Sequence, residues 1–220
     1  LLEGSHYPRI TPAHGLRHLF VAMDPCGGGE SCFAITSGFI TRSGELVIVG
    51  AESKPISNDQ DQEKLIDWHL SALRDLPEFA RCIIVNIIEN NYGGSVMASR
   101  ICAITQKHAP VHSMVEDTSR HGRVGVTTTE TVKQKMRVDL QRLLRLQQVL
   151  MYDRFVSTSM DTKAEICAQL RNYRVEWRQA KDVHGRSKMT LTGKRPGASN
   201  DDLAITTQFL AMWPSFFYSS

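Results

Sequence analysis

The first part of the chain alternates short apolar runs with turns. Apolar and β-branched residues fill positions 19–23, 32–40 and 45–51, and the links between these runs contain glycine. Short apolar runs separated by glycine-containing turns are typical of strands joined by tight connections. The pattern therefore predicts three consecutive antiparallel strands.

The middle of the chain switches between helical and strand periodicity. Residues 57–76 carry apolar side chains at helical spacing, which predicts an amphipathic helix that Pro77 ends. Residues 81–88 form a nearly unbroken apolar run, as expected of a central strand buried on both faces. Residues 95–108 then predict a second helix, and residues 111–115 predict a short strand.

The second half is less regular. Its predicted elements are two helices, two strands joined by a turn, and a final helix, at residues 127–148, 162–171, 173–179, 187–192 and 201–212. Thr127 to Thr129 and Asp161 are N-cap candidates for the two helices. The sequence contains no internal repeat and no convincing interdomain linker, so we expect one domain over residues 1–220, with residues 1–17 set aside as linker or vector-derived residues.

Three acidic positions stand out against this pattern. Asp24 ends the first apolar strand, Glu89 ends the apolar run of residues 81–88, and the pair Asp201 and Asp202 opens the last helix. Desolvating a carboxylate without a partner is costly, and no Arg or Lys stands beside Asp24. A distant basic residue or a metal ion is therefore implied.

Each acid also has a simpler explanation when it is taken singly. Asp201 or Asp202 could be a helix cap, and Asp24 or Glu89 could be a strand-end charge that reaches solvent. Taken together, two strand ends and a helix start favour a site for hard divalent ions, which prefer oxygen ligands.

The order of the elements indicates a fold. Three strands, a helix, a strand, a helix, a strand and a late helix follow the order of the ribonuclease H-like α/β fold of the integrase and resolvase superfamily, a mixed central sheet flanked by helices. In that fold, acids from the first strand, the fourth strand and a late helix meet at one edge. Asp24, Glu89 and Asp201 fall at those three places.

Composition narrows the class of protein only slightly. The chain has 220 residues, 41% of them hydrophobic, which is enough for a core, and a net charge of +3. Basic residues gather in the second half, and on charge alone a solvated surface explains them better than nucleic-acid binding does. Five cysteines without a CxxC pair indicate reduced thiols of an intracellular protein. Because no apolar run approaches the roughly 20 residues of a membrane span, we expect no membrane association.

Four motifs resemble a known family. FVAMDP, IIVNIIENNYGGSVMAS, TVKQKM and GKRPGASNDDLAIT are similar to motifs of the C-terminal nuclease domain of the herpesvirus terminase large subunit, of the cytomegalovirus type. The likeness covers residues 19–212. It implies a metal-dependent endonuclease that cuts concatemeric viral double-stranded DNA during genome packaging, using two divalent ions, Mg²⁺ or Mn²⁺.

The resemblance also implies a wider setting. The chain starts at Leu1 without an initiator Met, which fits a piece of a longer polypeptide, and it has no GxxxxGK[ST] phosphate loop of an ATPase motor. The expected partners are DNA and, through the full-length protein, the other terminase subunits and the portal. The expected compartment is the host nucleus.

The resemblance assigns roles to individual residues. Asp24 would bridge two ions about 4 Å apart, and Glu89 and Asp201 would each help to hold one of them. Asp201 is preferred to Asp202 because the run DDLA resembles the D-x-L-A start of the last catalytic helix in related nucleases. Lys133 would stabilise charge on the scissile phosphate or orient the water, although a solvated charge on a helix explains it equally well.

Basic residues in loops would bind the duplex. The expected phosphate contacts come from five positions, namely Arg120, Arg123, Lys188, Lys194 and Arg195. Such contacts position DNA without reading its sequence, and they weaken steeply with salt.

Three other functions remain open from the sequence. A Holliday-junction resolvase or integrase shares the fold and differs in its branched or end-specific substrates. A non-catalytic nucleic-acid-binding module would use the acids structurally. A phosphotransferase could cradle phosphate at the run DPCGGG that starts at Asp24, but the sequence lacks a second phosphate loop.

Overall fold

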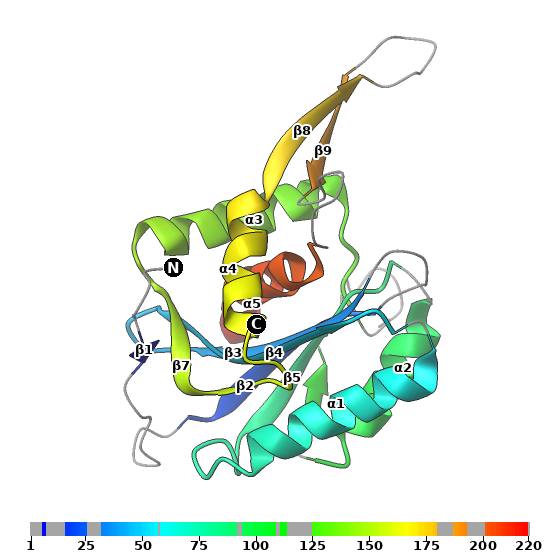
Figure 1. Ribbon diagram of the computed structural model, residues 1–220, viewed down its shortest axis with the longest axis vertical. Coiled ribbons are helices and arrows are strands. Elements are labelled where there is room, and N and C mark those ends of the chain that lie inside the picture. Colours follow the sequence, from blue (N-terminus) through cyan, green and yellow to red (C-terminus); the bar gives the residue numbers. More distant parts are fainter. Residues whose placement is uncertain are drawn as a thin grey trace.

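The computed structural model describes residues 6–7, 16–25, 32–56, 58–91, 94–108, 111–113, 125–179, 187–192 and 201–219. Within these ranges the centre of the molecule is a seven-stranded mixed sheet with the strand order β1-β7-β4-β3-β2-β5-β6. Helices cover both of its faces (Figure 1). The predicted mixed sheet flanked by helices is confirmed.

The first three long strands follow the predicted pattern. They are β2 (His18–Asp24), β3 (Phe33–Ile40) and β4 (Leu46–Lys54), which pair antiparallel in sequence order. Strand β5 (Ile83–Ile88) then pairs parallel with β2, and β6 (Val111–Ser113) pairs parallel with β5. These five strands form the centre and one edge of the sheet.

Two further strands extend the sheet beyond β4. Strand β7 (Val149–Val156) pairs parallel with β4, and the short β1 (His6–Tyr7) pairs parallel with β7. Neither strand is predicted from the sequence. The helix predicted to run to residue 148 is α3 (Glu130–Arg145), which ends earlier, and Gln147 takes a positive φ of 57° before β7 begins. Strand β1 lies in the segment that was set aside.

The helices form two layers, one on each face of the sheet (Figure 1). One layer holds α1 (Asp59–Arg74) and α2 (Gly94–Thr105). The other holds α3, α4 (Thr162–Asn172) and α5 (Asp202–Ser219). Side chains alternate along β2, so Leu19, Val21 and Met23 pack into the core beneath α1 and α2, whereas Phe20 and Ala22 pack into the core beneath α3 and α5.

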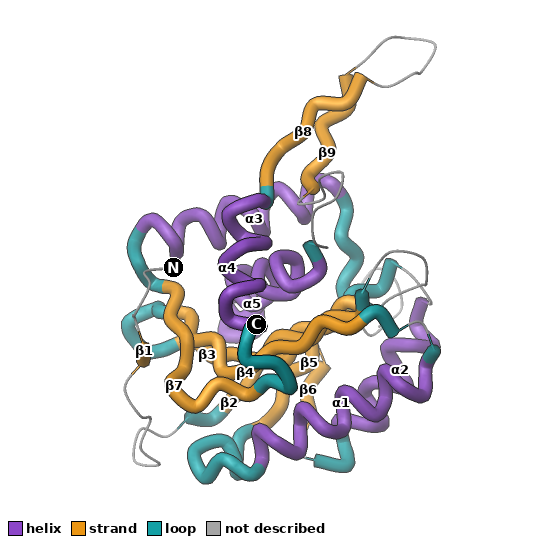
Figure 2. Tube along the Cα trace, in the orientation of Figure 1, coloured by secondary structure: helices purple, strands orange, loops and turns teal. Residues whose placement is uncertain are grey.

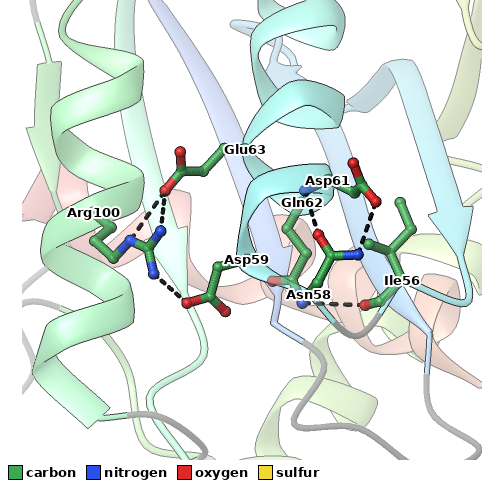
Figure 3. Close-up of polar contacts among 7 residues, drawn as sticks. All are labelled: Ile56, Asn58, Asp59, Asp61, Gln62, Glu63 and Arg100. Carbon is green, nitrogen blue, oxygen red and sulfur yellow. Dashed lines mark hydrogen bonds and ion pairs between the residues drawn. The ribbon is translucent and has the colours of Figure 1, made fainter.

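Polar side chains join α1 to α2, as Figure 3 shows. Arg100 on α2 donates hydrogen bonds to Asp59 and to Glu63, both on α1, with its Nε atom 3.0 Å from Glu63 Oε1.

Asn58 caps α1, because its side-chain oxygen accepts the Asp61 amide at 2.9 Å. This cap explains why the helix begins at residue 59.

Helix α5 lies close against the sheet. A Cβ atom at Gly38 on β3 would come within 2.7 Å of the Val47 carbonyl oxygen and 3.1 Å of Leu210 on α5. Beside it, the buried hydroxyls of Thr36 on β3 and Thr206 on α5 share a hydrogen bond of 2.7 Å. These contacts fix the start of α5 over β3. The helix also runs through Pro214 to Ser219, well beyond the predicted end at residue 212.

A two-stranded hairpin stands apart from the central sheet. Strands β8 (Arg174–Gln179) and β9 (Ser187–Thr192) pair antiparallel and project away from the body of the molecule beyond α3, as Figures 1 and 2 show. Both strands were predicted.

No helix in the described part of the chain is long and apolar enough to cross a membrane.

Candidate metal centre

Strand pairing brings Asp24 and Glu89 together. Met23 on β2 is the register partner of Ile88 on β5, and the Glu89 amide donates to the Met23 carbonyl at 2.9 Å. The alternation that places Ala22 and Ile87 beneath α3 and α5 places the next side chains of the same parity, Asp24 and Glu89, on that face. Both acids are buried, and their carboxyl groups are hydrogen-bonded to each other.

The surroundings of Asp24 disfavour its negative charge. Burial raises the pKa of the Asp24 carboxyl well above its ordinary value, and the charge of Glu89 and the hydrogen bond to it raise this pKa further. The charge of Asp202 raises it as well, whereas Lys133 lowers it. Two carboxylates in contact, with a third nearby, repel one another unless protons or a cation lie between them.

Asp202 reaches this site from the start of α5. Its Oδ2 atom accepts a hydrogen bond of 3.0 Å from the backbone amide of Cys32, the residue just before β3. Strand β3 is the antiparallel neighbour of β2, and Ala34 is the register partner of Asp24. The third acid that acts electrostatically on Asp24 is therefore Asp202.

Asp201, the residue before α5, is also buried. Its charge acts on Tyr173, the residue before β8. Burial raises the pKa of the Tyr173 hydroxyl to about 12, and the charge of Asp201 contributes to this rise, while the nearby Gln208 and Arg137 oppose it. Asp202 therefore acts on Asp24, and Asp201, preferred from the sequence as the third ligand, stays a prediction.

Lys133 lies near the start of α3 and faces the same site. Its charge lowers the pKa of Asp24, so the ammonium group is close enough to act on the acids. Thr129 caps α3 by accepting the Val132 amide at 3.3 Å, and the Lys133 amide donates to the Thr129 carbonyl at 2.9 Å. The position beside Asp24 argues against a purely solvated charge.

Two residues that the sequence analysis did not single out contact Glu89. The Thr128 hydroxyl donates to Glu89 Oε1, and the Asn91 side-chain amide donates to the same oxygen at 3.0 Å. Asn91 lies two residues after Glu89 in the ENN run, and Thr128 lies among the N-cap candidates of α3. Polar residues in such loops have no periodic pattern in the sequence. Their role is therefore recognised only from their contacts with Glu89 in the structure.

The predicted DNA-binding residues fall largely outside this description. Arg120, Arg123, Lys194 and Arg195 lie outside the described residues. Lys188 lies on β9 as the register partner of Arg178 on β8, so the hairpin carries two basic positions opposite each other.

An open hollow of about 780 Å³ lies elsewhere, at the start of α1. Its lining includes Asn58, Asp61 and Lys64, together with Arg100 from α2. Strand β4 ends at the same edge of the sheet as β2, but α1 and α2 cover the opposite face from Asp24 and Glu89. The hollow is therefore not part of the acidic site.

The residues present suit a hard divalent cation in their chemistry. In the described ranges, no three His, Cys, Asp or Glu side chains are arranged so that they could hold a metal ion by themselves, and the acids in direct contact are Asp24 and Glu89. Their buried oxygens, with Asp202 nearby, are the donors that Mg²⁺ and Mn²⁺ prefer. A cation would also remove the repulsion that now raises the pKa of Asp24.

The mixed sheet, with acids at the ends of two adjacent parallel strands and at the start of a packed helix, defines the ribonuclease H-like class of fold, as predicted. Solved structures of terminase nuclease domains share this fold. The human cytomegalovirus terminase nuclease domain, soaked with Mn and bound to an inhibitor, has a TM-score of 0.70 at 12% identity, over 95% of this chain and 88% of that one. Another structure of the same viral domain has a TM-score of 0.62 at 15% identity, over 89% and 82%.

A phage protein is similar as well. The nuclease domain of the large terminase subunit of bacteriophage Sf6, with manganese and beta-thujaplicinol, has a TM-score of 0.54 at 11% identity, over 88% of this chain and 87% of that one. No family model and no curated protein matches the sequence. At these identities the likeness establishes the fold, and the function has to be argued from the site.

Proposed function

We propose that this chain is a metal-dependent endonuclease of the terminase type, which cuts concatemeric viral double-stranded DNA during genome packaging, with the host nucleus as the expected compartment. The observation that carries the proposal is the buried contact between Asp24 and Glu89, with Asp202 and Lys133 acting on the same carboxyl. The resemblance of the motifs and the likeness to solved terminase nucleases support it.

Asp24, Glu89 and Asp202 would hold divalent ions, Mg²⁺ or Mn²⁺. The ions would supply a water activated at neutral pH and charge stabilisation of the leaving oxygen, which is the chemistry of two-metal phosphodiester hydrolysis. The charges of Glu89 and Asp202 both act on Asp24, which suits Asp24 as a ligand shared by two ions. Asp201, which the sequence favours as the third ligand, is the alternative to Asp202.

The remaining residues of the site would orient the metal ligands and neutralise charge on the DNA. Lys133 would place its positive charge beside the scissile phosphate and stabilise the charge that builds up during attack. Cys32 donates its amide to Asp202 and so holds that carboxylate in place at the start of β3. Basic residues of the loops and of the hairpin would bind the DNA backbone.

The proposal is tested by incubating the purified chain with supercoiled plasmid DNA and Mn²⁺, Mg²⁺ or EDTA. Wild-type protein should nick and linearise the plasmid only with a divalent ion, and Asp24→Asn and Glu89→Gln should lose this activity. A matched control, Asp67→Asn on the exposed side of α1, should cut like the wild type. DNA binding without cutting in any metal would refute the nuclease and leave a binding module.

A further inference from the structure

The Glu89 carboxylate is held by two side chains from different parts of the chain. Thr128 donates its hydroxyl to Glu89 Oε1, and Asn91 donates its amide to the same oxygen at 3.0 Å. Both bonds end on Oε1, so neither of them uses Oε2. A carboxylate with one oxygen occupied by two donors has a fixed orientation, because rotating it would break both bonds.

Asn91 and Thr128 are also joined to each other. The Asn91 amide nitrogen donates to the Thr128 carbonyl at 3.4 Å and contacts the Thr128 hydroxyl, and Asn91 Oδ1 accepts the Thr128 amide at 3.2 Å. The Asn91 side chain therefore satisfies both backbone groups of Thr128. This pairing fixes the hydroxyl that reaches Glu89.

The backbone around this pair is built to keep the two segments together. The Val126 amide donates to the Ile88 carbonyl at 2.7 Å, and the Asn90 amide donates to the Val126 carbonyl at 2.8 Å. Gly125 makes the approach possible, because its φ of +107° is unfavourable for other residues and a Cβ atom there would lie 3.0 Å from Asn90 Cβ and from the Ile88 carbonyl oxygen. The end of β5 and the start of α3 thus form one unit.

We propose that Asn91 and Thr128 are positioning residues of the metal centre. They hold Glu89 by Oε1 and leave Oε2 for a divalent ion shared with Asp24, and they fix the first turn of α3, which carries Lys133, against the same carboxylate. The inference rests on the proposed function, since it assigns a ligand role to Glu89. Groups that orient a metal ligand typically change metal affinity by about 10- to 100-fold when they are removed.

The test uses Mn²⁺ alone as the probe, with binding measured by titration calorimetry on the purified chain. Thr128→Val removes the hydroxyl at nearly constant volume and should raise the Mn²⁺ Kd about 10- to 100-fold. Thr128→Ser keeps a hydroxyl and should restore binding to near the wild-type value. Thr131→Val, the same change at an exposed position of α3, should leave the Kd unchanged.

Asn91→Ala gives a second variant, at an exposed position, in case Thr128→Val fails to fold. It should also raise the Mn²⁺ Kd. Added Mn²⁺ should restore plasmid cutting, because the variant is impaired in metal affinity and not in the chemical step. A wild-type Kd in Thr128→Val or in Asn91→Ala would overturn the inference. So would Thr128→Ser binding no better than Thr128→Val, because the effect would then come from packing.

A metal-free measurement separates this inference from the proposed function. In EDTA, the side-chain amide protons of Asn91 should exchange with solvent at least about tenfold more slowly in the wild type than in Thr128→Val, since hydrogen bonding protects them. If the wild type neither binds Mn²⁺ nor cuts DNA, the proposed function is wrong, whatever the exchange shows. Equal exchange rates in the two proteins would instead overturn the positioning role alone.

Discussion

The backbone amide of Cys32 donates to the Asp202 carboxylate at 3.0 Å and so ties the start of β3 to the start of α5. A bond to a main-chain donor fixes the carboxylate relative to the sheet and does not depend on the identity of the Cys32 side chain. Asp202 is thereby directed to the edge where Asp24 and Glu89 meet. The charge of the adjacent acid, Asp201, acts on Tyr173.

The first prediction separates the two adjacent acids. Asp202→Asn should reduce metal-dependent plasmid cutting by at least about 100-fold, as expected when one electrostatic component of such a site is removed. Asp201→Asn should keep both cutting and Mn²⁺ binding. Cutting rates at saturating Mn²⁺ check this, and the opposite result, loss in Asp201→Asn alone, would assign the third ligand to Asp201.

The second prediction concerns the stability of the acidic site. Near neutral pH in EDTA, Asp24→Asn should melt at a higher temperature than the wild type, because it removes a buried charge that Glu89 and Asp202 repel. Mn²⁺ at 100 times its Kd should raise the wild-type melting temperature by about 5–10 °C, which corresponds to about 2.7 kcal/mol.

Melting curves with and without Mn²⁺ provide the measurement. The metal should not shift the curve of Asp24→Asn, because a neutral amide is a poor replacement for a carboxylate ligand. An equal Mn²⁺ shift in both proteins would mean that the ion binds somewhere other than at Asp24.

The third prediction tests Lys133. Lys133→Gln should reduce cutting by about 100-fold or more, since it removes a positive charge beside the reacting phosphate, and Lys133→Arg should retain part of the activity. Lys135→Gln is a matched control, because Lys135 lies over the Phe216 ring, 4.2 Å from its centroid, and not beside the acids. If Lys133→Gln cut DNA at the wild-type rate, Lys133 would be a solvated charge on α3 without a role in cutting.

The fourth prediction concerns pH and the buried His69. Its Nε2 atom lies 2.8 Å from the Ser37 hydroxyl, and burial lowers the pKa of the imidazole to about 3. Because the unfolded chain binds a proton near pH 6.5 and the folded chain does not, the folded state loses stability as the pH falls from about 6.5 toward 3.

The slope should approach about 1.4 kcal/mol per pH unit from this group. Urea unfolding at pH 7, 6 and 5 measures it, with His69→Gln as the comparison. The variant should lack this part of the slope, whatever its absolute stability. Equal pH dependences of the unfolding free energy in the two proteins would show that His69 takes up no proton when the chain unfolds.

The fifth prediction concerns DNA binding. Charge reversal at Lys194 and Arg195 should weaken DNA affinity at low salt and reduce the slope of log K against log salt by roughly 2, since each lost phosphate contact removes about 0.9. Reversal of Lys64 and Lys107, on the α1 and α2 side of the molecule, is the matched control and should change neither quantity. Unchanged affinity and salt dependence in the first variant would exclude these two residues from the DNA interface.

Much of the sheet could be predicted because its strands carry their own signal. The apolar runs of β2 and β5 indicate buried strands without reference to the rest of the chain. Strand β7 was missed because it mixes Asp153 and Arg154 with apolar residues and owes its place to parallel pairing with β4, a partner far away in sequence.

The site was predictable as a set of acids but not in its details. Asp201 and Asp202 are adjacent, so only the placement of α5 over β3, fixed by Gly38 and the bond between Thr36 and Thr206, determines which one faces Asp24. The contacts of Asn91 and Thr128 with Glu89 join two loops. Such contacts leave no periodicity in the sequence from which they could be inferred.

The parallel pairing of β2 with β5, together with the docking of α5, has a consequence for biosynthesis. Asp24 is translated long before Asp202, so contacts of such long sequence separation form only after slow, non-local closure of the chain. A ribosome-bound or partly folded chain would therefore lack the assembled acids. Assembly of the three acids is thus coupled to completion of the tertiary structure.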